Sequence, residues 1–124
     1  MQLAELIEKL QGVWLTKEIQ SAVDVHYVGA ADLMSDILAL TSHPMLLITG
    51  LTAIQTVRTA EMSGHIQAIV FVRGKNADIN TIRLAEENEI PLITTRLTMY
   101  ECCGILYQAG ILPVPLKQHH DTSL

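Results

Sequence analysis

The chain has 124 residues, a length that suits one domain and leaves no room for two of ordinary size. Apolar residues make up 49% of the chain and charged residues 17%, which excludes an intrinsically disordered protein. The net charge of −5 argues against nucleic acid and against an anionic membrane surface as partners, because both attract basic patches.

Neither membrane insertion nor secretion is indicated by the sequence. No apolar run reaches the roughly 18 residues of a membrane span, and residues 1–12 form an amphipathic helical pattern, not a signal peptide. Cys102 and Cys103 are adjacent, so they cannot link distant segments by a disulfide bond. We therefore expect a reducing, cytoplasmic location.

The first part of the chain contains short, mixed patterns. Apolar residues recur with helical spacing over 3–10, and Gly12 is placed to end the predicted helix. A short strand is expected over 13–16, and alternation of apolar and polar residues predicts another over 23–27, close to a sheet edge. Asp32 is placed to cap the short helix that follows.

From residue 45 onward, predicted strands and helices alternate. Continuous apolar runs predict three buried strands, over residues 45–49, 68–72 and 91–94. The helix after the first strand ends at Gly64, and the helix after the second is capped by Asp78. The predicted core face of the helix capped by Asp78 consists of Ile79, Ile82 and Ala85.

The last predicted helix has the clearest signals. Thr98 and Glu101 have the T-x-x-E spacing of a capping box, and Gly110 is placed to end the helix. Its predicted core face consists of Met99, Cys102, Cys103 and Leu106. Successive β-α units of this kind form right-handed crossovers in a parallel sheet. We predict an α/β, three-layer, Rossmann-like domain over 1–112, with helices on both faces of a mostly parallel sheet, and a polar, flexible tail over 113–124.

Three stretches carry a family resemblance: ADLMSDILA (31–39), LLITGLT (46–52) and the run from AIVFVRGK to IPLITTRLTMYECCGILYQAGI (68–111). Together they resemble the DRTGG domain in its stand-alone form. The chain is also similar to the DRTGG segment of phosphate acetyltransferases and CBS-pyrophosphatases, and to the N-terminal domain of HPr kinase/phosphorylase. The pentapeptide that gives the family its name is absent, so no catalytic residue is transferred by motif. The resemblance implies an accessory, regulatory domain that tends to pair with itself.

A ligand site is predicted at the carboxyl ends of the strands, where the amino ends of helices meet in open α/β sheets. Hydroxyl groups, a flexible glycine and three cations in these loops suit a phosphate or carboxylate. The candidate residues are Asp32, Thr49, Gly50, Thr52, Arg73, Lys75, Thr94, Thr95 and Arg96. The alternative is that such residues only cap helices and form turns.

Other residues give weaker indications. Asp32 and Asp36 share one helix face, as a metal or acid–base pair would, although a cap beside a solvated charge is the simpler interpretation. Gly104 lies opposite the core face of the last helix and is a candidate for contact with a second subunit. Cys102 and Cys103 are interpreted as core residues, since a structural zinc site needs four ligands.

No phosphate-binding loop, dinucleotide fingerprint or nucleophile elbow is present, so no catalytic residue, cofactor or metal is assigned. The leading hypothesis is a non-enzymatic regulatory module that acts as a homodimer and contacts a larger protein partner. The alternative is a sensor that binds a small anion or nucleotide, and the third hypothesis is a small enzyme of phosphate chemistry.

Overall fold

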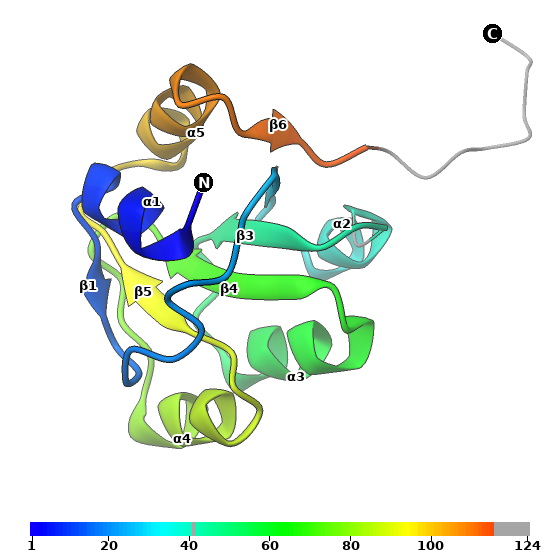
Figure 1. The fold of residues 1–124 in the computed structure, drawn as a ribbon. Helices are drawn as coiled ribbons and strands as arrows, with labels where there is room; N and C mark the ends of the chain where they lie inside the picture. Colours follow the sequence, from blue (N-terminus) through cyan, green and yellow to red (C-terminus); the bar gives the residue numbers. More distant parts are fainter. Residues whose placement is uncertain (41, 116–124) are drawn as a thin grey trace, which may run out of the picture.

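The computed structural model describes residues 1–40 and 42–115, which form one mixed sheet between two layers of helices (Figure 1). The helices are α1 (Leu3–Lys9), α2 (Met34–Leu40), α3 (Ile54–Ser63), α4 (Ile79–Glu87) and α5 (Met99–Gln108). The strands are β1 (Val13–Trp14), β2 (Tyr27–Ala30), β3 (Met45–Thr49), β4 (Ile66–Phe71), β5 (Leu92–Thr94) and β6 (Leu112–Pro113). No described helix combines the length and the apolar character needed to cross a membrane.

The six strands follow the order β1-β5-β4-β3-β2-β6. The β1–β5 pair is antiparallel, whereas every other neighbouring pair is parallel. The predicted α/β architecture with a mostly parallel sheet is therefore confirmed. Because the parallel strands point the same way, the loops that follow β2, β3, β4 and β5 all leave the sheet at one edge.

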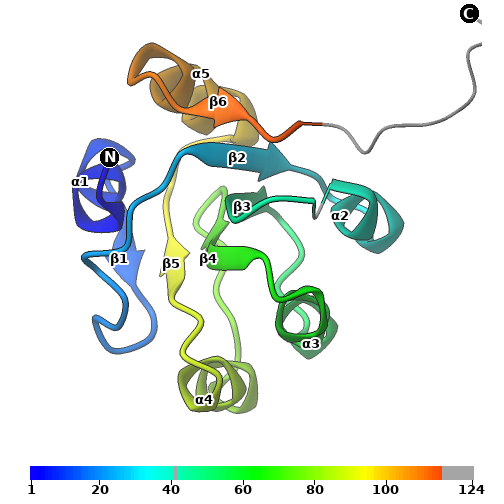
Figure 2. The same ribbon diagram turned by 45° about the vertical axis from the view of Figure 1, so that its right-hand side comes forward.

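The sheet is covered on both faces, as Figure 2 shows. Leu46 and Ile48 of β3 pack with residues of α1 and α5. Met45 and Leu47 of the same strand pack with residues of α2, α3 and α4. All five β3 residues are buried, which explains why this strand has a continuous apolar run with no alternation. Burial of each of the four apolar side chains of β3 contributes about 2 kcal/mol to folding.

Helix ends follow the sequence signals closely. Gly64 ends α3 in the left-handed conformation, with φ of 69°. The Asp78 carboxylate accepts a hydrogen bond from the Thr81 backbone N–H at 2.8 Å, and Thr98 and Glu101 complete the capping box of α5. These three predictions are confirmed because the signals that begin and end helices depend on local sequence.

Two predictions about the N-terminal part are wrong. The sheet strand β2 begins at Tyr27, because Val25 donates its backbone N–H to Met1 and Asp24 pairs with Gln2 in an isolated bridge. The left-handed residue after α1 is Gln11, with φ of 54°. Gly12 instead permits close packing, since a Cβ there would lie 2.6 Å from the Ile93 Cγ2 atom.

The predicted core face of α4 is also wrong in part. Ile79 is 58% exposed, and Thr81 takes the inward position with Ala85. Packed structure continues past the expected boundary at Leu112, because Pro113 pairs in β6 and Val114 is buried. The rest of the predicted tail, from residue 116, lies outside the described residues.

Candidate functional site

Four of the nine predicted ligand residues surround a fifth, Gly50, which follows β3 directly. The Gly50 backbone N–H donates to Asp32 Oδ1 at 2.6 Å, and the Lys75 ammonium donates to the Gly50 carbonyl at 3.1 Å. The Thr49 hydroxyl also donates to Asp32 Oδ1, at 3.4 Å. Three strand-to-helix loops therefore meet at a single glycine.

Gly50 lacks a side chain at the point where three charged groups approach it. A Cβ at Gly50 would lie 3.1 Å from Arg73 Nη2, 3.3 Å from Asp32 Oδ1 and 3.4 Å from Lys75 Nζ. We call Asp32, Gly50, Arg73 and Lys75 the Gly50 cradle. The cradle contains two cations and one carboxylate, which leaves a local excess of positive charge in a chain of net charge −5.

The two cations of the cradle have no carboxylate partner in the described part of the chain. Among residues 1–40 and 42–115, the carboxylate of Asp24 makes both short contacts of this kind, with the N-terminal ammonium and with the His26 ring. The Lys75 ammonium instead contacts a neutral backbone carbonyl. Arg73 and Lys75 therefore keep their capacity to pair with an anion.

The position of Arg73 is set by a strained turn. Arg73 and Gly74 have φ of 59° and 68°, and the Lys75 N–H closes the turn on the Val72 carbonyl at 3.2 Å. A non-glycine residue in this conformation costs about 1 kcal/mol. The turn is held by its own amides, since Arg73 donates to Leu97 at 2.9 Å and Gly74 donates to Thr95 at 2.7 Å.

The other predicted site residues have structural contacts. Thr94 donates its hydroxyl to the Lys75 carbonyl and Thr95 donates its hydroxyl to the Leu10 carbonyl, each at 2.6 Å. Thr52 is half-buried in the loop before α3. Arg96 is exposed and borders a separate cavity of about 220 Å³ beside Gly74. None of these four residues is among the three nearest neighbours of a Cβ built at Gly50.

Asp32 has a different role from the predicted helix cap. Helix α2 begins at Met34, two residues later, and the Asp32 carboxylate bonds across to Gly50 and Thr49. Helix α3 begins at Ile54, and its N-cap residue Ala53 forms no side-chain cap. The first turn of α3 therefore receives no side-chain cap from its N-cap residue.

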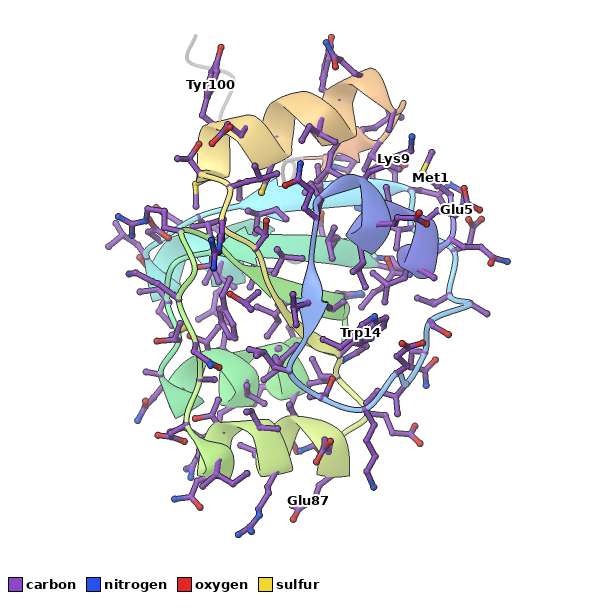
Figure 3. All side chains as sticks on the ribbon, turned by 90° about the vertical axis from the view of Figure 1, so that its left-hand side faces the viewer. Met1, Glu5, Lys9, Trp14, Glu87 and Tyr100 are labelled. Atoms are coloured by element: carbon purple, nitrogen blue, oxygen red, sulfur yellow. The ribbon has the colours of Figure 1, made fainter. Side chains whose placement is uncertain are left out.

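A second region of interest is the outward side of α5. Cys102 and Leu106 are fully buried against the sheet. Tyr100, Gly104 and Tyr107 follow the spacing i, i+4, i+7 on the other side, where Tyr100 is 87% exposed and Tyr107 is 75% exposed. Figure 3 shows Tyr100 pointing away from the body of the domain. Sequence reasoning selected Gly104 but missed the two tyrosines, whose helical spacing was the available signal.

A groove of about 310 Å³ adjoins this stripe. It is lined by Val28, Ala30, Cys103, Tyr107, Ile111 and Pro113, none of which is charged. We call these six residues, together with Tyr100 and Gly104, the α5–β6 surface. Gly104 has open space around it, since nothing lies within 4 Å of the position of a Cβ.

The two thiols of α5 are in their protonated form at neutral pH. Burial raises the pKa of Cys102 to about 11 and raises the pKa of Cys103. Since the thiolate is the reactive and metal-binding form, this environment disfavours both roles. Among the described residues, no three His, Cys, Asp or Glu side chains are grouped to hold a metal ion.

The fold is similar to that of a solved regulatory region. That structure is the crystal structure of the CBS and DRTGG domains of the regulatory region of Clostridium perfringens pyrophosphatase, complexed with its activator diadenosine tetraphosphate. The TM-score is 0.66 over 96% of this chain, at 17% sequence identity, and this chain spans 51% of that one. The similarity shows that this chain and part of that regulatory region share a fold. No protein-family profile and no curated protein matches the chain.

Proposed function

We propose that the chain is a non-enzymatic regulatory domain that forms a homodimer through the α5–β6 surface and contacts a larger protein partner. The observation that carries this proposal is the outward side of α5. Tyr100 and Tyr107 are two of the three tyrosines of the chain, and both expose most of their surface on this helix. Exposed aromatic residues beside an apolar groove are typical of protein-binding surfaces.

A second copy of the chain fits this surface for a geometric reason. In a two-fold dimer each copy offers the same patch, so a projecting side chain must find a recess in the same patch of its partner. Tyr107 projects from α5 and also borders the groove, so it supplies both parts. Gly104 lies between the tyrosines and lets two α5 helices approach closely.

The similar structure supports a regulatory role and a larger partner. That regulatory region contains CBS domains and a DRTGG domain, and the present chain spans about half of its length. The matched part is about half of that regulatory region, so in that protein this fold is joined to a further part of the chain. We propose that this chain acts on a partner in the same manner.

Self-association is tested with Tyr107→Asp. We expect light scattering at micromolar concentration to give about twice the 13.7 kDa chain mass for the unaltered protein. The substituted protein should dissociate at least about tenfold more readily, because a carboxylate would be buried without a partner.

The matched control is Ile79→Asp, which changes an exposed apolar residue on α4 and should leave the dimer unchanged. A protein that stays monomeric at high concentration contradicts the proposal. Equal weakening by both substitutions contradicts it too, because the effect would then be one of charge alone.

The second candidate function is a sensor for a small oxyanion or nucleotide. The specific observation in its favour is that Arg73 and Lys75, beside Gly50, form no ion pair with any residue that the structure describes. The activator of the similar regulatory region is a dinucleotide polyphosphate, which has the matching charge. A sensor function and a dimer are compatible, since the Gly50 cradle and the α5–β6 surface share no residue.

A further inference from the structure

The Gly50 cradle already holds an oxyanion, which is the carboxylate of Asp32. Its contact with the Gly50 N–H, at 2.6 Å, is short for an N–H···O bond and typical of a charged acceptor. The backbone amide after β3 is therefore shaped and oriented to receive a negatively charged oxygen.

The Asp32 carboxylate is not locked in this place. Asp32 is exposed, lies two residues before α2, and uses only Oδ1 for hydrogen bonds within the described residues. It forms no ion pair with Arg73 or Lys75 in that part of the chain. Rotation of this one side chain would open the Gly50 amide without moving a strand or a helix.

An external polyphosphate would gain contacts that Asp32 does not make. Its several oxygens can pair with the Arg73 guanidinium and the Lys75 ammonium while one oxygen accepts from Gly50. Gly50 gives the ligand room, because a Cβ there would fall within 3.4 Å of all three charged groups.

We infer that the Gly50 cradle binds a phosphate-type oxyanion in the place that the Asp32 carboxylate occupies, so that Asp32 is a built-in competitor of the ligand. The inference rests on the second candidate function, and it specifies both the ligand chemistry and the residue that limits affinity. Loss of Asp32 from the cradle is thus expected to strengthen binding, whereas loss of a ligand contact weakens it.

The test uses pyrophosphate as the probe, with calorimetry for affinity and the Gly50 amide resonance for position. Asp32→Asn keeps an oxygen acceptor but removes its charge, and we expect it to bind pyrophosphate at least tenfold more tightly than the unaltered protein. Arg73→Ala and Lys75→Ala should each bind at least tenfold more weakly. Their matched controls are Arg83→Ala and Lys9→Ala, which remove exposed cations of the same kind from α4 and α1.

Gly50→Ala tests the space in the cradle. The Gly50 backbone does not have a left-handed φ, so alanine suits its conformation, yet the added Cβ should abolish binding. Gly104→Ala is the matched control, because the Cβ there enters open space. ATP, adenosine and citrate serve as comparison ligands that identify the chemistry of the site. A phosphate site is supported if ATP binds as tightly as pyrophosphate, citrate binds more weakly and adenosine does not bind.

The inference is overturned if Asp32→Asn binds pyrophosphate no more tightly than the unaltered protein, or if the Gly50 amide does not shift. It is also overturned if adenosine shifts the Gly50 amide and pyrophosphate does not. The proposed dimer is judged separately, because the cradle substitutions do not touch the α5–β6 surface. A monomer that binds pyrophosphate would contradict only the proposed dimer. A dimer that does not bind pyrophosphate would contradict only the proposed ligand site.

Discussion

Helices α4 and α5 both follow a buried parallel strand and both begin with a side-chain cap, yet they present different chemistry to solvent. The outward side of α4 carries Arg83 and Glu87 after the exposed Ile79, and Figure 3 shows Glu87 pointing away from the domain. The outward side of α5 carries Tyr100 and Tyr107, with Gly104 between them. The two helices therefore begin with the same kind of capping signal, but their exposed sides carry different types of side chain.

A charged outward face is what an isolated domain needs, because it keeps a helix solvated on one side and packed on the other. Apolar and aromatic side chains contribute to binding only when another surface covers them. On this reasoning α4 completes a domain, whereas α5 both completes the domain and offers a contact surface.

The largest expected contrast lies within α5, between its two thiols. Cys102 is fully buried and its pKa is raised to about 11, so at pH 8 only about one molecule in a thousand carries the thiolate. Cys103 borders the groove of the α5–β6 surface and is only half-buried. We expect maleimide to modify Cys103 orders of magnitude faster than Cys102, measured by mass spectrometry of peptides.

Repeating the maleimide measurement at several protein concentrations tests whether a second copy covers Cys103. If a second copy covers the groove, the rate at Cys103 should fall as concentration rises through the dimerisation range. Both thiols should react alike in denaturant. A Cys103 rate that is independent of concentration, in a protein that scatters as a dimer, would place the interface elsewhere.

A smaller effect is expected from substitution of Gly104. Gly104→Ala should stabilise the monomer by about 1 kcal/mol, because alanine favours an exposed helix interior and nothing lies near the added Cβ. Gly104→Leu should also favour the helix but weaken the dimer, since its larger side chain separates the two α5 helices. Thermal unfolding reports the first change and light scattering the second. Dimers of equal strength in both variants would exclude Gly104 from the contact.

Sequence patterns predicted most of the architecture, because the relevant signals are local. The apolar run of β3, the αL glycine at 64 and the caps at Asp78 and Thr98 depend on neighbours within a few residues. The start of β2 was mispredicted since residues 23–25 pair with the N-terminal segment, a contact between distant parts of the chain. Ile79 was placed in the core by spacing, although Thr81 occupies the inward position.

The candidate site was predicted as a set of loops but not as an arrangement. Topology alone brings Asp32, Gly50, Arg73 and Lys75 to one edge, and the structure places them around a single glycine. The sequence could not show that the Thr95 hydroxyl is directed to Leu10, since that bond spans a large separation along the chain. Nor could it show that Asp32 reaches the Gly50 amide, because its position before α2 has the pattern of a cap.

The smallest expected effect concerns the N-caps of α4 and α5, which should differ in how their contribution to stability depends on pH. The cap of α4 is the Asp78 carboxylate, whose pKa is lowered from its ordinary value of 3.8 by the hydrogen bond from the Thr81 backbone N–H. A lowered folded pKa means that the ionised cap stabilises the fold above about pH 3.8, and that this contribution is lost as pH falls through the folded pKa. The melting temperature of the unaltered protein should therefore exceed that of Asp78→Ala at pH 6, and the gap should narrow below pH 3.8.

Asp78→Asn is the control, because its amide oxygen caps without titrating, so its difference from Asp78→Ala should stay constant. At α5 the Thr98 hydroxyl accepts from the Glu101 N–H and does not titrate in this range, so Thr98→Ala should lower the melting temperature of the chain at both pH values. A gap for Asp78→Ala that persists unchanged at pH 3 would show that the charge of this cap contributes nothing to α4.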